Sequence, residues 1–320
     1  MKPSSINTKL VLVPASRKGK DTIKEARRDR IIRIIRLILV YLFLSAAALL
    51  CIFPFYYMIA ASTMSHEEVS HGQFWLSFST LAENFVNNYT QTFSRLQFVK
   101  HVGTTLLVAI TTTALQLLTT VLAAFAFAKL HFKGRDVLFI AMLSAMMVPG
   151  EMLAITNYST FSNLDLISNE QTYFQAFVTM VLPLISSVFY IFLLRQNFKQ
   201  IPNELYLASK VDGKSDWQFL WKVMVPLAAP TLIAITILSF IFSWNSYVWP
   251  SLSVYNSDYN VISVIIRGDA LQFEGPSGAL ITNSAWQMTA AVLTVVPLLI
   301  LFIIFRKYIM SGTGRAGIKG

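Results

Sequence analysis

The feature that most constrains this chain is a series of apolar blocks, most of them twenty or more residues long and nearly free of charge. A helix of about twenty apolar residues crosses the roughly 30 Å hydrocarbon core of a bilayer. Charged residues make up 13% of the chain, whereas soluble globular proteins carry about a quarter. The sequence therefore predicts an all-α integral membrane protein.

Six blocks are candidate transmembrane helices. The third is interrupted by Pro149, Gly150 and Glu151, and proline removes a backbone donor and loosens a helix. The predicted spans are residues 37–58, 102–128, 137–158, 171–194, 223–249 and 286–305.

The distribution of lysine and arginine predicts the orientation of the spans, because cytoplasmic loops of membrane proteins are enriched in these residues. With six spans and both termini cytoplasmic, all but three of the 26 lysines and arginines lie inside; the exceptions are Arg95, Lys100 and Arg267. Residues 1–34 then form a basic cytoplasmic extension, residues 35–310 the transmembrane domain and residues 311–320 a cytoplasmic tail. We expect the basic arm to contact lipid headgroups and not nucleic acid.

Residues 201–227, between the fourth and fifth spans, predict two short helices joined by a glycine corner on the cytoplasmic side. Pro202 suits a helix start, and Gly213 suits a helix end that turns. Ser215 and Gln218 form the pattern of a capping box that begins the second helix. Ala208 and Ser209 are small, so another surface is expected to approach the first helix there.

This segment resembles the coupling loop, or EAA loop, of ATP-binding-cassette importer permeases. The family pattern is matched at Ile201, Pro202, Glu204, Leu205, Ala208, Asp212, Gly213, Ser215, Pro226 and Leu227. The chain departs from it at Leu207, where the family has a glutamate, and at Ser209, where it has a second alanine. The resemblance implies the MetI-like, or type I importer, permease fold. It also implies that Glu204, Leu205, Ala208, Ser209, Asp212, Gly213 and Ser215 couple the chain to a cytoplasmic ATPase dimer.

The end of the chain is similar to the closing signature of the maltose-type second permease in the carbohydrate branch of this family. The matches that bear on the tail are Gly312, Gly317, Lys319 and Gly320. The resemblance implies a bacterial plasma-membrane permease subunit for sugars, partnered by a second homologous permease, the ATPase dimer and an extracytoplasmic solute-binding protein. It implies no cofactor in this chain, because ATP and magnesium are bound by the ATPase.

Polar residues within the spans have two interpretations. The threonines and Gln116 of the second span fit the usual role of hydrogen-bonding helices together. Trp244 and Asn245 are better candidates for the solute pathway, because an indole can stack on a sugar ring and an amide can bind its hydroxyls. The four histidines are dispersed, and we expect neither a metal site nor catalytic residues.

Other functions remain open alternatives. The same fold could carry glycerol phosphate, an amino acid or a peptide. A secondary transporter would want coupling carboxylates at membrane depth, and only Glu151 approaches one. A membrane enzyme would need a convergent set of acid, base or nucleophile, which the spans do not offer.

Overall fold

The computed structural model describes residues 18–76, 78–274 and 278–313, with the side chains of residues 18–29, 151 and 307–313 excepted. The chain divides into two units, residues 1–57 and 58–320, each considered by itself. The regular elements of the described part are helices, except for one two-stranded antiparallel sheet. That sheet departs from the all-α prediction.

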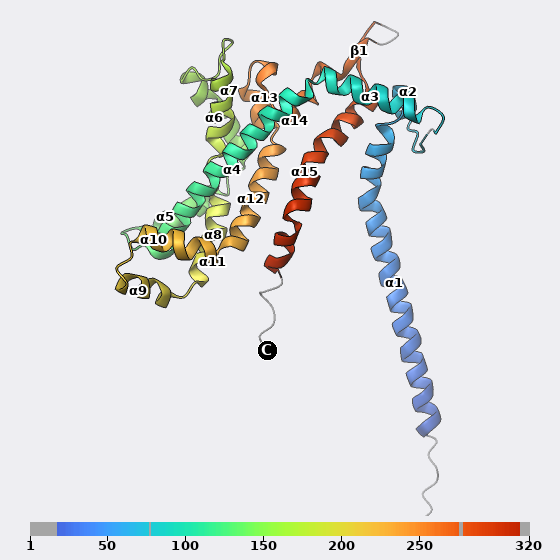
Figure 1. Cartoon of the computed structure of the whole chain (residues 1–320). Coiled ribbons are helices and arrows are strands. Elements are labelled where there is room, and N and C mark those ends of the chain that lie inside the picture. The colour runs from blue at the N-terminus through green and yellow to red at the C-terminus, as the bar shows by residue number, and fades with distance from the viewer. Residues whose placement is uncertain (1–17, 77, 275–277, 314–320) are drawn as a thin grey trace, which may run out of the picture. The chain divides into compact units, whose positions relative to one another are not determined.

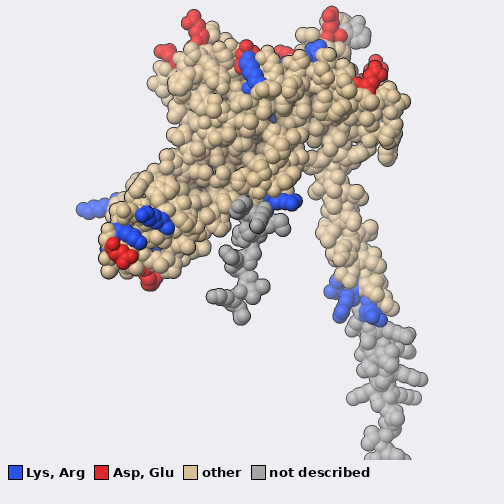
Figure 2. Space-filling model, viewed as in Figure 1, with Lys and Arg blue, Asp and Glu red and all other residues tan. Residues whose placement is uncertain are grey.

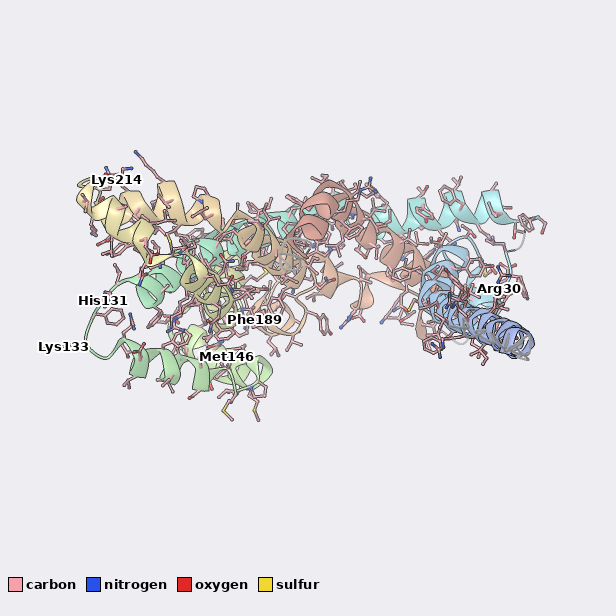
Figure 3. The ribbon with its side chains drawn as sticks, turned by 90° about the horizontal axis from the view of Figure 1, so that it is seen from below. Arg30, His131, Lys133, Met146, Phe189 and Lys214 are labelled. Carbon is pink, nitrogen blue, oxygen red and sulfur yellow. The ribbon has the colours of Figure 1, made fainter. Side chains whose placement is uncertain are left out.

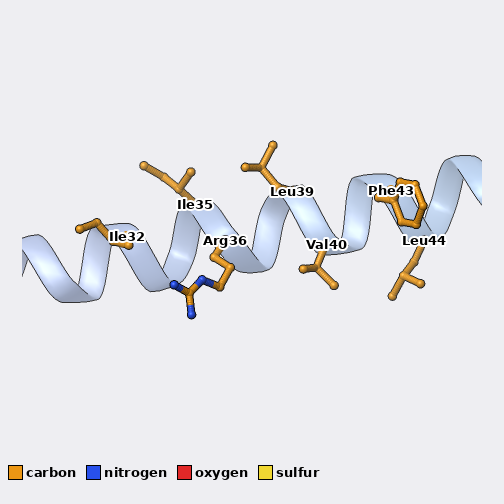
Figure 4. Close-up of a pocket in the computed structure, with 7 residues that line it drawn as sticks. All are labelled: Ile32, Ile35, Arg36, Leu39, Val40, Phe43 and Leu44. Carbon is orange, nitrogen blue, oxygen red and sulfur yellow. The ribbon is translucent and has the colours of Figure 1, made fainter.

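Helix α1 (Lys18–Ala61) supplies the described part of the first unit. Its segment Arg30–Ala61 is long and apolar enough to cross a membrane, and no residue of its most apolar window is buried. Seven side chains of this one helix line an apolar hollow around Arg36 (Figure 4). Because a single helix forms this hollow, it indicates a face for lipid or a protein neighbour and not a closed site.

The second unit is organised around α4 (Phe98–Lys129), which packs against α8 (Val188–Gln200) and α12 (Ala229–Trp244) (Figure 1). α15 (Ser284–Thr313) packs against α12 and α3 (Leu81–Arg95). We call the end of this unit that carries α9 (Asn203–Val211) and α10 (Asp216–Phe219) the coupling end.

Among the described residues, three helices are each long and apolar enough to cross a membrane, and the number rises to five when each of two bent pairs is taken as one span. One pair joins α7 (Tyr173–Val181) and a 3₁₀ turn to α8 across a 48° bend, so the predicted fourth span is broken. The other pair bends by 80° at Ala228, just before α12. The predicted third span consists of two helices, α5 (Arg135–Ala145) and α6 (Gly150–Asn163). Its predicted interruption is confirmed.

The break in the fourth span explains why α4 carries two polar side chains that face it. Pro183 lies in the 3₁₀ turn, and the chain re-enters a helix after Ser187. Gln116 donates a hydrogen bond to the carbonyl of Leu184 at 2.8 Å, and Thr119 donates to that of Ile185 at 2.6 Å. These carbonyls lack helical partners, and an unsatisfied buried carbonyl is costly. The predicted helix-joining role is confirmed for both side chains.

The segment between α12 and α15 folds back onto α4. It contains α13 (Val248–Ser253), α14 (Ile262–Ile265) and a hairpin of β1 (Gln272–Glu274) with β2 (Leu280–Thr282). Ile262 and Leu271 are almost fully buried. The backbone N–H of Ile262 donates to the hydroxyl of Thr105 at 2.9 Å. Most of this segment is therefore packed structure. The short helix α2 (His66–Ser70) precedes α3 near the start of α15.

Candidate functional site

The predicted corner at Gly213 is confirmed. Gly213 has φ +70°, and no atom lies within 4 Å of the position that a Cβ would take. Its N–H donates to the carbonyl of Lys210 at 3.0 Å, and the N–H of Lys214 donates to that of Ser209 at 2.9 Å. This pair of bonds is a Schellman motif, in which the residue after the helix adopts the left-handed conformation. Glycine is therefore favoured at this corner by the backbone conformation, and not because neighbouring atoms leave no room for a side chain.

The second helix of the loop begins as the sequence predicts. The hydroxyl of Ser215 accepts from the N–H of Gln218, and the amide oxygen of Gln218 accepts from the N–H of Ser215. The helix continues through a π-helical turn (Leu220–Met224) and α11 (Val225–Leu227) to the bend at Ala228. Pro202 lies one position before α9, as its N-cap. The two helices are therefore defined at both ends by local signals.

A polar cluster holds the two helices together across the corner. Asp216 accepts from the hydroxyl of Tyr206 at 2.7 Å and pairs with the ammonium of Lys210 at 2.8 Å. Burial and the hydrogen bond to Asp216 raise the pKa of the Tyr206 phenol. The hydrogen bond to Asp216 raises the pKa of Lys210. The Tyr206 ring also packs edge-on against buried Phe219, with ring centroids 5.2 Å apart. These contacts fix the angle between α9 and α10.

One cationic side chain, Lys129, fastens the loop to α4, and a second, Arg195, ties α8 to α4 and α5 next to it. The buried ammonium of Lys129, at the end of α4, donates to the carbonyl of Ile201 and to Oδ1 of Asn203, each at 2.8 Å. Arg195 on α8 donates to the carbonyl of Phe127 at 3.1 Å and lies 3.6 Å from the ring centroid of Phe139 on α5. The loop therefore moves with the ends of α4, α5 and α8.

The apolar core beneath the loop extends this connection. A single cluster of buried residues includes Phe125 on α4, Leu194 on α8, Phe219 on α10 and Ile235 on α12. Well-packed interiors transmit displacement with little compression. A push on α9 and α10 is therefore passed to three of the long helices of the unit.

The exposed surface of α9 and α10 carries four large apolar side chains among charged and polar ones. Val211 is 88% exposed, Leu207 62%, Trp217 60% and Leu205 44%. Exposed apolar patches of this kind mark surfaces that bind a partner. Leu207, where the family has a glutamate, extends this patch.

Ser209 does not lie on that surface. It is 5% exposed, and its hydroxyl donates to the carbonyl of Tyr206 at 2.7 Å. This chain itself covers Ser209, and the approach of a partner surface at this residue stays a prediction. Glu204, Ala208, Asp212, Gly213 and Ser215 are exposed. Their contact with an ATPase stays a prediction.

The two pathway candidates lie at the end of α12. Trp244 is 2% exposed and stacks on Phe240, with centroids 6.0 Å apart. Asn245 is exposed, and its amide donates to the carbonyl of Ile241 at 2.9 Å. Trp244 thus packs within this chain, and the pathway role of both residues stays a prediction. In the tail, Gly317, Lys319 and Gly320 lie outside the described residues, and Gly312 is in the last turns of α15.

Sequence reasoning missed Lys129 as a support of the loop and Arg195 as a tie between α8, α4 and α5. The sequence carried a signal for each, a cation at the end of an apolar block. Cations there are usually assigned to lipid headgroups, so only the tertiary contacts distinguish these two.

Comparison with known families decides what kind of protein carries this loop. Residues 116–314, more than half of the chain, match the family described as "Binding-protein-dependent transport system inner membrane component". The chain belongs to this family. The matched region contains the whole coupling loop, α12 and α15. As a permease-family member the chain is a membrane-integral transport component and not an enzyme.

Individual relatives agree with this membership. The lactose transport system permease protein LacG of Rhizobium radiobacter is 29% identical over 273 residues, covering 85% of this chain and 93% of the relative. The trehalose/maltose transport system permease protein MalG of Thermococcus litoralis is also 29% identical, with the same coverage. A chain of a bacterial ABC transporter that imports the acidic polysaccharide alginate has the same fold, with a TM-score of 0.71. It is 23% identical and aligns over 88% of this chain and 98% of its own.

Proposed function

We propose that this chain is a permease subunit of an ATP-driven sugar importer in a bacterial plasma membrane, and that residues 201–227 couple it to a cytoplasmic ATPase. The observation that carries the proposal is the coupling loop itself. It presents exposed Val211 and Leu207 on one side and is joined on the other to α4, α8 and α12 through Lys129 and a shared core. A partner that pushes on the loop would therefore move the helices.

The proposed topology has six spans with both termini in the cytoplasm. Five follow from the three long helices and two bent pairs, and the sixth from α5 and α6 taken together. On the face shown in Figure 2, most of the lysines and arginines of the second unit lie at or near the level of the coupling end, a few lie at the opposite end, and most of the carboxylates lie at that opposite end. This distribution supports a cytoplasmic coupling end.

The proposed partners are a second homologous permease, an ATPase dimer and an extracytoplasmic solute-binding protein. The ATPase would meet the apolar surface of α9 and α10. The binding protein would meet the opposite end, which α14 and the β1–β2 hairpin form. The C-terminal tail, including Gly317 and Lys319, would reach toward the ATPase.

Glycerol phosphate is the main alternative to a sugar as the transported solute. LacG and MalG are named for lactose and for trehalose and maltose. The relative UgpE of Rhizobium meliloti, 27% identical over 276 residues, is named for sn-glycerol-3-phosphate. Uptake by the assembled transporter, measured with labelled di- and oligosaccharides and with glycerol 3-phosphate, distinguishes the two. Transport of glycerol phosphate alone would replace the sugar assignment.

A matched pair of substitutions tests the coupling surface. Val211→Asp places a charge on the most exposed apolar residue of the loop, and a buried charge without a partner opposes docking. Leu280→Asp makes the same kind of change at a residue 69% exposed in β2. We expect the affinity-purified permease to lose its ATPase in the first variant and to retain it in the second. Equal retention in both would show that the loop surface does not bind the ATPase.

A further inference from the structure

A cationic cavity lies beside the coupling loop. It measures about 390 Å³ and lies between the α4–α5 connection, the end of α8 and the start of α9. We call it the basic pocket. Figure 3 shows His131 and Lys133 on the α4–α5 connection. Three cations and a histidine line the pocket: Lys129, Arg135, Lys199 and His131. The other lining residues are Ala128, Asn203, Tyr206 and Leu207, so no carboxylate lines it.

The cations of the basic pocket are incompletely neutralised. Lys129 is buried, and its two acceptors, a carbonyl and an amide oxygen, are neutral. An ammonium group has three donors, so one remains for a further acceptor. Lys199 is exposed and forms no ion pair with any residue that the structure describes. The cations of the basic pocket are therefore arranged to bind an anion.

The two nearby carboxylates, Asp136 and Glu204, offset only part of this charge. Asp136 pairs with Arg135 at 3.1 Å and lies 3.9 Å from Arg195, so it is already shared by two guanidinium groups. Glu204 on α9 is exposed and forms no direct ion pair within the described part of the chain, but its charge acts on Lys129 through space and offsets part of that lysine's charge. A positive charge excess remains in the basic pocket.

The position of the pocket indicates where its ligand comes from. Lys129 ends one candidate span, and Lys199 lies in the last turn of α8. A second, separate hollow shares His131 and Arg135 with the pocket and is also lined by Phe132, Asp136 and Val137. From there α5 presents an exposed apolar surface, including Val137 at 71% and Ile140 at 63%. A cationic pocket close to an apolar helix face suits a ligand with an anionic head and a hydrocarbon tail.

We propose that the basic pocket binds the phosphate of an anionic membrane lipid, whose acyl chains lie along α5. The phosphate would accept hydrogen bonds from Lys129 and Lys199, and the bound headgroup would bear directly on Asn203 and Tyr206 of the coupling loop. Basic pockets at the cytoplasmic ends of membrane helices bind such headgroups. The inference rests on the proposed function only in placing the pocket at the cytoplasmic leaflet.

The test uses the full chain purified in detergent and titrated with phosphatidylglycerol or phosphatidylcholine, with bound lipid counted by native mass spectrometry. Lys199→Gln removes one cation of the pocket without removing a described structural contact. Lys133→Gln is the control, because Lys133 has the same charge, is also exposed, lies on the α4–α5 connection that borders the pocket and does not line the pocket. We expect preferential retention of phosphatidylglycerol. We also expect a loss of about fivefold in apparent affinity for Lys199→Gln, as for one cation near an anionic surface, and no loss for Lys133→Gln.

Three outcomes would overturn the proposal. Equal losses in the two variants would indicate only a general surface charge. Displacement of the lipid by millimolar inorganic phosphate or glycerol 1-phosphate would assign the pocket to a soluble anion. Loss of ATPase association in Lys199→Gln, with lipid binding unchanged, would make the pocket part of a protein interface. Because lipid retention is measured on the chain alone, the lipid proposal can fail or stand independently of the proposed transport function.

Discussion

Replacing Gly213 is the most direct perturbation of the coupling loop. Its φ of +70° is in the left-handed region, and no neighbouring atom obstructs a side chain. The cost of substitution is therefore conformational. It is about 1–2 kcal/mol for an ordinary L-residue and less for asparagine, which tolerates this region. A β-branched residue is at the upper end of that range or above it.

The expected order of loop integrity is Gly, then Asn, then Ala, then Val. A cost of about 2 kcal/mol changes an opening equilibrium by about thirtyfold. The N–H of Lys214, bonded to the carbonyl of Ser209 at 2.9 Å, reports that opening by hydrogen exchange. We expect its protection to fall by about that factor in Gly213→Val.

Solute uptake is the functional assay, normalised to the amounts of permease and ATPase in the membrane. Gly72→Val is the matched control, because Gly72 has φ +73° and an equally open surrounding but lies between α2 and α3. We expect uptake to be largely lost in Gly213→Val and retained in Gly72→Val. Normal uptake in the first variant, or equal impairment in both, would refute the role of the corner in coupling.

Three further predictions concern topology, support and chemistry. In a Cys51→Ser background, Ser215→Cys should be labelled by an impermeant thiol reagent in inside-out vesicles but not in intact cells; labelling in intact cells would reverse the topology. Lys129→Met removes two charge-assisted bonds, each of a kind that contributes about 1.5–3 kcal/mol, so hydrogen exchange at α9 should quicken while α15 is unchanged; no change at α9 would mean that the lysine does not support it. The purified chain alone should not hydrolyse ATP above background, and hydrolysis in a preparation free of ATPase subunits would contradict the need for a partner.

The break in the fourth span shows what sequence patterns left undecided. Pro183 and Ser187 lie inside an apolar block that is long enough for one continuous helix. A proline in a membrane helix produces either a mild kink or a full break, depending on whether other groups bond the freed carbonyls. Here Gln116 and Thr119 supply those bonds from α4, almost seventy residues earlier in the chain.

The features that the sequence determined by itself are those whose cause is local. Helix boundaries at Ser215 and Gly213 depend on hydrogen bonds between residues at most five positions apart and on the sign of one φ angle. Membrane insertion depends on the summed hydrophobicity of a continuous block. Tertiary structure alone decided that Ser209 is buried while Val211 is exposed, and that Lys129 is a support of the loop. Those outcomes depend on which distant helix lies against each face. Helical periodicity predicts which residues share a face, but it does not predict which helix packs against that face.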